Sequence, residues 1–176
     1  MKKILAVLLL LCTVLAFVAC ANKDQTPDGM KDVAIEGADY HLYVPEAWIP
    51  TNTAGLSGAH AGGGDKPFSP NVIVTVYYPD GVTTLAAYFK DVVKPELDLT
   101  FAELVPVENE KAVTMGGKDA LLYTYTYTLG GTAYKQMQVI VGNGSCIYTL
   151  AYTATANLYD TYIEEVNRII AEFTFK

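Results

Sequence analysis

Three consecutive stretches in the C-terminal half of the chain have the composition of β-strands and are joined by very short turns. They span residues 120–129, 132–141 and 146–153, and the turns contain Gly130-Gly131 and Gly142-Asn143-Gly144. Glycine-containing turns of this length join antiparallel neighbours in a sheet. The sequence therefore predicts a three-stranded antiparallel meander around which the rest of the fold is built.

Two segments outside the meander have apolar side chains at helical spacing. The first helix is expected to begin after Thr83 or Thr84 and to stop at Pro95, and the second covers residues 159–170. Shorter strands are expected over residues 33–36, 40–44, 71–78, 104–107, 112–115 and 173–175, with a turn at Gly37-Ala38-Asp39. This order of elements predicts an α+β fold, in which an antiparallel β-sheet with a C-terminal meander is packed by two main helices.

The first nineteen residues have the pattern of an export signal. Lys2 and Lys3 precede an apolar run, residues 4–18, which is shorter than the roughly 20 residues that a membrane span requires. The sequence Phe17-Val18-Ala19-Cys20 resembles the lipobox of bacterial lipoproteins, in which the cysteine is acylated and becomes the mature N-terminus. The resemblance implies that acylated Cys20, carrying for example palmitate, anchors the protein in the bilayer on the extracytoplasmic side of the cell membrane. The alternative is an ordinary secretory signal in which Cys20 is incidental.

These signals divide the chain into three parts. Residues 1–19 form the predicted signal peptide, residues 20–31 the lipidated cysteine and a polar tether, and residues 32–176 a single domain. Cys12 leaves with the signal and Cys20 carries lipid, so Cys146 has no intrachain partner. We expect Cys146 to behave as a small buried apolar residue.

One stretch near the start of the domain resembles a sequence of the PsbP-like proteins. Residues 40–48, Tyr-His-Leu-Tyr-Val-Pro-Glu-Ala-Trp, look like the family's strand that ends in Pro-x-Gly-Trp, with Ala47 in place of the glycine. The strand at residue 71, the helix at residue 85 and the closing helix and strand over 159–175 follow in the family's order. The resemblance implies an αβα sandwich. Because the family includes a photosystem II subunit, an import factor that binds the GTPase Ran and bacterial envelope lipoproteins, it also implies binding or scaffolding more than catalysis.

Motifs for catalysis are incomplete in this sequence. Gly55-Leu56-Ser57-Gly58-Ala59, followed by His60, approaches the nucleophile elbow of hydrolases but lacks its last glycine and the required strand and helix. Gly62-Gly63-Gly64-Asp65-Lys66 is not a Walker A motif, because Pro67 follows the lysine. We therefore predict no enzymatic activity and no cofactor.

Several residues are candidates for ligand binding. The segment 51–70 lacks periodicity and is rich in glycine. It contains His60 and Asp65, which could bind a metal weakly together with His41. Because no zinc-type spacing is present, no metal site is predicted. Tyr123, Tyr125 and Tyr127 alternate along one strand and share a face. These rings either form core under the helices or, with Tyr148 and Tyr152, form an exposed platform for a sugar or a peptide.

Charge and motifs together favour binding to a protein. The net charge is −7, and it becomes more negative without Lys2 and Lys3, which argues against nucleic acid as a partner. The predicted function is that of a non-enzymatic, membrane-anchored envelope lipoprotein that binds a protein partner or assists a complex. The alternative is capture of a small ligand (a sugar, a peptide or a metal) by the 51–70 loop and the tyrosine-rich sheet face.

Overall fold

The computed structural model describes residues 26–51, 55–62, 68–81 and 83–176. Its centre is a seven-stranded sheet in the order β4-β5-β6-β10-β9-β8-β7, in which every pair of neighbours is antiparallel. The predicted signal peptide, Cys20 and Asp65 lie outside the described residues. The strands of this sheet are β4 (Ile49–Pro50), β5 (Ser57–His60), β6 (Asn71–Tyr77), β7 (Ala102–Met115), β8 (Lys118–Leu129), β9 (Thr132–Asn143) and β10 (Cys146–Thr155).

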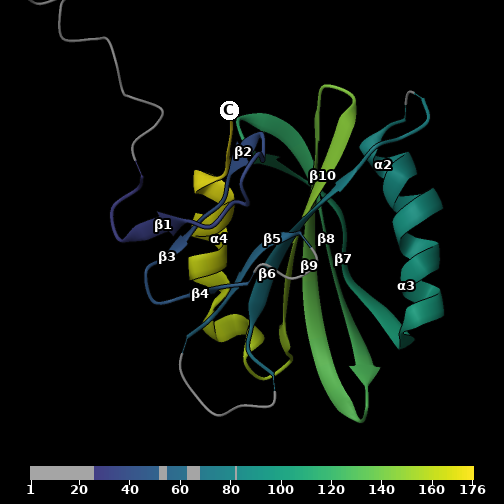
Figure 1. Cartoon of the computed structure of the whole chain (residues 1–176). Coiled ribbons are helices and arrows are strands. Elements are labelled where there is room, and N and C mark those ends of the chain that lie inside the picture. Colours follow the sequence, from purple (N-terminus) through teal and green to yellow (C-terminus); the bar gives the residue numbers. More distant parts are fainter. Residues whose placement is uncertain (1–25, 52–54, 63–67, 82) are drawn as a thin grey trace, which may run out of the picture.

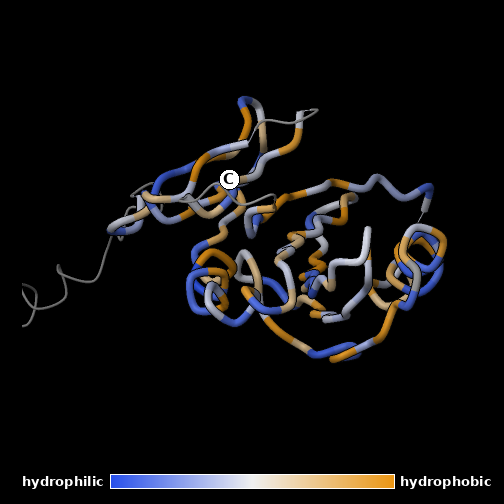
Figure 2. The backbone as a smooth tube through the Cα atoms, turned by 90° about the horizontal axis from the view of Figure 1, so that it is seen from below, coloured by the Kyte–Doolittle hydropathy of each residue, from blue (hydrophilic) through white to orange (hydrophobic). Residues whose placement is uncertain are grey.

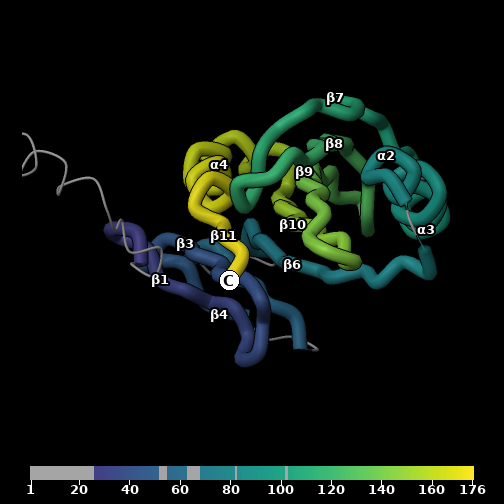
Figure 3. Tube along the Cα trace, turned by 90° about the horizontal axis from the view of Figure 1, so that it is seen from above, coloured from purple at the N-terminus to yellow at the C-terminus, as the bar shows by residue number. Residues whose placement is uncertain are grey.

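Helices cover both faces of this sheet, which makes the domain an αβα sandwich (Figures 1 and 3). One face packs against a continuous helical run made of α2 (Leu85–Tyr88), the π-helical segment η2 (Phe89–Val93) and α3 (Lys94–Thr100). The other face packs against η3 (Tyr159–Thr161) and α4 (Ile163–Glu172). The predicted α+β class and both main helices are confirmed.

The C-terminal meander is confirmed strand by strand. β8 pairs with β9 without a register shift from Ala120↔Val141 to Leu129↔Thr132, and β9 pairs with β10 in the same regular way. The turn between β8 and β9 needs glycine, since Gly130 and Gly131 have φ values of 58° and 79°. Alternate residues of the three strands therefore point to opposite helices.

Pro95 does not stop the first helix, which runs on to Thr100. The proline occupies one of the first two positions of α3, where its missing N–H costs little. Immediately before it the chain forms the π-helical segment η2, in which hydrogen bonds reach one residue further than in an α-helix. The predicted boundary was wrong because the widened turn accommodates the ring inside the run.

The N-terminal residues form short strands rather than the predicted hairpin of 33–36 with 40–44. β1 (Met30–Asp32) pairs with β3 (Tyr43–Pro45), and β2 (Tyr40–His41) pairs with the C-terminal strand β11 (Thr174–Phe175). The fold starts before the predicted boundary at residue 32, because Met30 is buried in the core and Lys31 belongs to β1. The expected final edge strand is present as β11.

The segment 51–70 is not a structureless loop, because it contains β5, which pairs with β6 from Ser57↔Val74 to His60↔Asn71. Gly58 and Gly62 permit close approach between backbones. A Cβ on Gly58 would lie 2.7 Å from the carbonyl oxygen of Val72, and one on Gly62 would lie 2.3 Å from that of Ala47. In the sequence these glycines suggest a loop, but in the structure they allow dense packing of neighbouring backbones.

β7 is a single irregular edge strand where two weaker strands were predicted. Its pairing with β8 shifts register three times, between Ala102 and Lys111. Glu103 and Glu110 have φ values of 58° and 47°, as expected at bulges. The bulges and Pro106 interrupt the free edge of the strand, which opposes pairing with another chain.

Apolar residues lie along both interfaces between the sheet and the helices, and hydrophilic residues are interspersed along the helices (Figure 2). The larger core lies on the α4 side and includes the fully buried Trp48, Tyr148, Tyr152 and Phe173. On the opposite face, Tyr88, Tyr123 and Ile140 form one cluster and Leu97, Tyr125 and Tyr127 a second.

The turn between β7 and β8 gives a matched pair of substitutions. Gly116 and Gly117 both have positive φ, but a Cβ on Gly116 would lie 2.6 Å from the ring of Phe175, whereas a Cβ on Gly117 would meet nothing within 4 Å. We expect Gly116→Ala to lower the free energy of unfolding by about 2 kcal/mol, because overpacking adds to the strain of a left-handed residue. Gly117→Ala retains only the strain, about 1 kcal/mol. Urea unfolding of both variants tests this, and equal losses would contradict it.

Candidate functional site

Tyr123, Tyr125 and Tyr127 are core residues, with exposed fractions of 3%, 3% and 6%. They lie on the face of β8 that packs under α2 and α3. Tyr148 and Tyr152 are also buried, but they belong to the core on the α4 side. The alternative of an exposed tyrosine platform is therefore wrong, because the rings are buried and divided between the two faces of the sheet.

The buried tyrosines stack on aromatic residues of the covering helical run and of the position that follows it. The Phe89 and Tyr123 rings lie parallel with centroids 3.5 Å apart, and Phe101 stacks on Tyr127 at 3.9 Å. Burial raises the pKa of Tyr123 and of Tyr127 to about 12. These hydroxyls therefore stay protonated at neutral pH and offer no base to a reaction.

Ser57 has a structural role. Its side chain is fully buried, and its hydroxyl accepts hydrogen bonds from the backbone N–H of Ile35 at 3.0 Å and from the hydroxyl of Tyr40 at 2.7 Å. His60 lies three residues further along β5, so its side chain points to the opposite face of the sheet. The two residues cannot form a nucleophile and its base, which agrees with the absence of a complete elbow motif.

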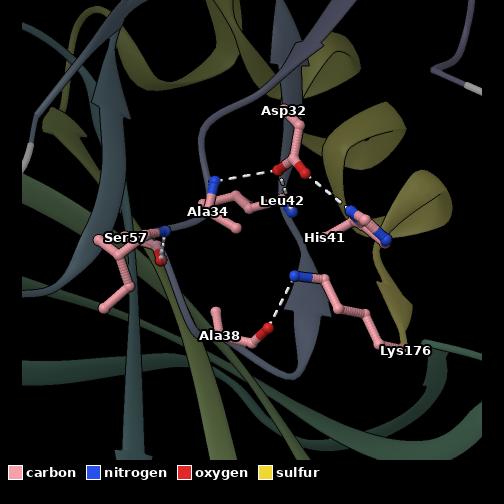
Figure 4. A network of polar contacts seen from close by, with 8 residues as sticks. Asp32, Ala34, Ala38, His41, Leu42, Ser57 and Lys176 are labelled. Carbon is pink, nitrogen blue, oxygen red and sulfur yellow. Dashed lines mark hydrogen bonds and ion pairs between the residues drawn. The ribbon is translucent and has the colours of Figure 1, made fainter.

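His41 takes part in a polar network that joins the N-terminal strands (Figure 4). One oxygen of Asp32 lies 2.7 Å from Nδ1 of His41, and the other accepts the backbone N–H groups of Ala34 and Leu42. The His41 ring also stacks on Tyr43. Among the described residues no group of three metal-ligating side chains occurs, and His60 contacts the carbonyl oxygen of Ala61.

The structure instead reveals a groove between β7 and α4, on the side of the sheet opposite α2. We call it the β7–α4 groove; its volume is about 440 Å³. It opens where the bulged strand β7 departs from the regular plane of the sheet. Its lining residues are Val107, Glu108 and Lys111 of β7, Leu122 and Thr124 of β8, Lys135 and Met137 of β9, and Tyr159, Asp160, Ile163 and Asn167 of η3 and α4.

The groove combines an apolar floor with charged walls. Leu122 and Met137 form the floor, and Val107 on the rim is 56% exposed. Within the groove, Lys111 pairs with Glu108 at 3.3 Å, and Lys135 pairs with Asp160 at 3.4 Å. Exposed pairs of this kind contribute little to stability, so their charges can be exchanged for those of a partner.

Tyr159 fixes one wall of the groove. The ammonium of Lys135 lies 4.1 Å from the centre of its ring, in a cation–π contact. Burial raises the pKa of Tyr159 to about 12, opposed by a hydrogen bond with Thr124. The wall is therefore built from neutral phenol and paired charges, which suits recognition more than proton transfer.

A second hollow lacks the charged residues of the groove. A hollow of about 570 Å³ lies between the β9–β10 turn and the chain that leads into α2, and the residues that line it carry no charge. Cys146 lines it, and this half-buried thiol has no disulfide partner among the described cysteines. This hollow thus provides no charged side chain, whereas the β7–α4 groove provides apolar and charged contacts together.

No pattern in the sequence indicates the groove directly. Val105 and Val107 were assigned to a weak strand, and their exposures of 55% and 56% depend on bulges that only pairing with β8 reveals. Lys111, Lys135 and Asp160 come from three distant segments. A useful signal was available in the sequence of β7 itself, where Pro106 and three glutamates interrupt an apolar strand.

Comparison with solved structures identifies the fold. The chain is similar to LpqN of Mycobacterium tuberculosis, which is described as involved in cell envelope biogenesis: identity is 18%, the TM-score is 0.62, and the match covers 84% of this chain and 91% of that one. Cyanobacterial PsbP (CyanoP) of Synechocystis is 13% identical, with a TM-score of 0.63 over 92% and 99% of the two chains. A Pseudomonas aeruginosa protein of unknown function, described as a putative regulator, is 13% identical, with a TM-score of 0.56 over 79% and 92%.

These similarities confirm the predicted PsbP-like fold. No protein-family model and no curated protein matches the chain. Identities this low establish the arrangement of the chain and leave function to be argued from the site. In the described part of the chain, no helix is long and apolar enough to cross a membrane.

Proposed function

We propose that this protein is a non-enzymatic lipoprotein of the bacterial cell envelope, anchored through acylated Cys20, whose domain binds a protein partner in the β7–α4 groove. The observation that carries the proposal is the groove itself, with exposed Val107 beside an apolar floor and charged walls. Such a surface fits an extended polypeptide segment better than a reacting substrate. The similarity to LpqN, a protein described as involved in cell envelope biogenesis, supports an envelope role.

The groove favours a partner of particular chemistry. An apolar side chain of the partner would cover Leu122 and Met137, which line the floor. The net charge of −7 attracts a segment with a positive charge, and Glu108 and Asp160 on the groove walls are placed to receive it. We therefore expect the partner to present an extended segment with an apolar residue next to lysine or arginine.

The alternative of small-ligand capture loses the exposed tyrosine-rich face of β8 that it requires. Tyr123, Tyr125 and Tyr127 are in the core, and Asp65 lies outside the described residues. His60 stands at the end of β5, away from the tyrosine cluster of β8 in the order of the sheet.

Replacing Cys20 tests the anchor. We expect Cys20→Ala to move the protein from the membrane fraction to the soluble extracytoplasmic fraction, because the acyl chains supply about 0.8 kcal/mol of membrane binding per buried methylene. Cys12→Ala is the matched control, since it removes a thiol from the predicted signal and leaves the acylation site intact. Immunoblots of fractionated cells measure the distribution. Retention of Cys20→Ala in the membrane fraction would show that the anchor is not this cysteine.

Site-specific photo-crosslinking tests the groove in cells. A photoreactive residue at position 107, on the groove rim, is expected to give a discrete crosslinked product. The same residue at position 75, which is exposed on β6, is expected to give none. The product at position 107 should also weaken when Asp160→Lys replaces a carboxylate that is placed to receive the partner's basic residue with a positive charge. A product of equal yield at both positions, or one insensitive to Asp160→Lys, would refute docking in the groove.

A further inference from the structure

A second, much smaller cavity lies behind the rim of the groove, between α3, β7 and β8. Its volume is about 50 Å³, and apolar side chains form most of its wall. Glu108 and Thr124 line both this cavity and the groove. The bulged part of β7 is therefore a thin wall, with the groove on one side and the cavity on the other.

Tyr125 brings an unpaired polar group to this cavity. Its side chain is 3% exposed, and its hydroxyl has no hydrogen-bond partner among the described residues. Neighbouring Tyr123 differs, because its hydroxyl interacts with Glu110. A buried hydroxyl without a partner costs about 1–3 kcal/mol, so a bound molecule that satisfies it is strongly favoured.

The irregular pairing of β7 creates the space. Pro106 pairs with Tyr125 and Glu108 with Thr124, so Val107 has no opposite residue on β8. Pro106 also lacks a backbone N–H, which removes a donor that could have turned toward this region. The strand bows outward at this point, and Glu108 and Asn109 join Tyr125 in lining the cavity.

We propose that this cavity is a binding site for a neutral, water-sized molecule, in practice one ordered water or two, held by the Tyr125 hydroxyl together with the polar groups of Glu108 and Asn109. Size supports this assignment, because a water molecule occupies about 30 Å³ of liquid, whereas apolar rings bind in cavities of about 150 Å³. The chemistry agrees, since a buried water usually makes about three hydrogen bonds to otherwise unsatisfied groups. Burial raises the pKa of Tyr125 above its ordinary value, so the hydroxyl remains a donor at every physiological pH.

The bound water supports the bulge from behind. It fills the space that the outward bow of β7 leaves and connects this strand to β8 where direct pairing is interrupted. The site thus stabilises the geometry of the rim that carries Val107, whatever the groove binds. Neither the thermal unfolding of Tyr125→Phe nor a high-resolution structure involves a partner, so both results are independent of the proposed function.

Tyr125→Phe, made in the full chain, distinguishes a hydrated site from a dry one. If the hydroxyl is bound to water, removing it loses hydrogen bonds, and Tm is expected to fall by about 3 °C. If the hydroxyl is unsatisfied, its removal relieves a cost and Tm rises. Tyr127→Phe is the matched control on the same face of β8, and it is expected to change Tm by less than half as much. An unchanged or higher Tm for Tyr125→Phe would overturn the proposal.

A high-resolution structure of the full chain provides an independent test. Water density within hydrogen-bond distance of the Tyr125 hydroxyl is expected in the wild-type protein and should be weakened or lost in Tyr125→Phe. A cavity without water in the wild-type protein would refute the assignment even if the variant fails to fold. A larger molecule in the cavity would refute the stated class of ligand.

Discussion

Replacing Trp48 with alanine is expected to lower the free energy of unfolding by about 3–5 kcal/mol, the usual cost of removing a buried tryptophan. Trp48 is 1% exposed, and its ring meets the ring of Tyr162 edge to face at 6.2 Å. Its indole N–H donates to the carboxylate of Glu165 on α4. The substitution therefore removes core contacts and a link between the N-terminal strands and α4 in one step.

The neighbouring residue provides the control for this prediction. Ile49 is 50% exposed, so Ile49→Ala should cost well under half as much as Trp48→Ala. Trp48→Phe retains a ring and removes the indole N–H, and we expect an intermediate loss. Urea unfolding of the three variants gives the comparison. A loss below about 1 kcal/mol for Trp48→Ala would mean that the N-terminal strands do not depend on this contact.

Local patterns predicted those parts of the fold in which each element follows from its own residues. Glycine turns and apolar strands specify the meander because its neighbours in space are neighbours in sequence. The face of α4 that carries Val166, Ile169 and Ile170 is buried, as its helical spacing predicted. Trp48, which ends the segment 40–48 that resembles PsbP-like proteins, lies in the core.

Predictions failed where a distant backbone decided the local conformation. Gly58 and Gly62 indicate a loop in isolation, yet each lies against the carbonyl group of another segment. Pro95 indicates a helix end, yet the helical run continues past it, because the π-helical turn η2 immediately before it accommodates a residue without a backbone N–H. In both cases the same residue chemistry has two structural uses, and only tertiary packing selects between them.

The candidate site was harder to predict than the fold. Alternation along β8 correctly placed three tyrosines on one face, but alternation does not show whether a face is covered by a helix. The β7–α4 groove depends on bulges in an edge strand and on side chains from four segments. Neither feature leaves a periodic pattern in the sequence.

Replacing Val107 with aspartate is expected to weaken partner binding at least a hundred-fold, which corresponds to about 2.7 kcal/mol. Val107 is 56% exposed in the free protein, so the new carboxylate stays in water and stability changes little. On docking, the carboxylate would replace an apolar contact beside Leu122 and Met137, and its desolvation opposes binding. Titration of the crosslink-identified partner against the wild-type and variant proteins measures the ratio of dissociation constants.

Thr75→Asp adds the same charge to an exposed position on β6, so its effect separates loss of the groove from a general increase in negative charge. Because the expected partner segment is basic, the control should bind as well as the wild-type protein or slightly better. Equal weakening by the two substitutions would indicate that charge alone governs binding. Weakening by Val107→Asp alone, with an unchanged Tm, would locate the contact at the bulged rim of β7. The new carboxylate is exposed in the free protein and so leaves stability unchanged, but it is buried in the complex and so lowers affinity.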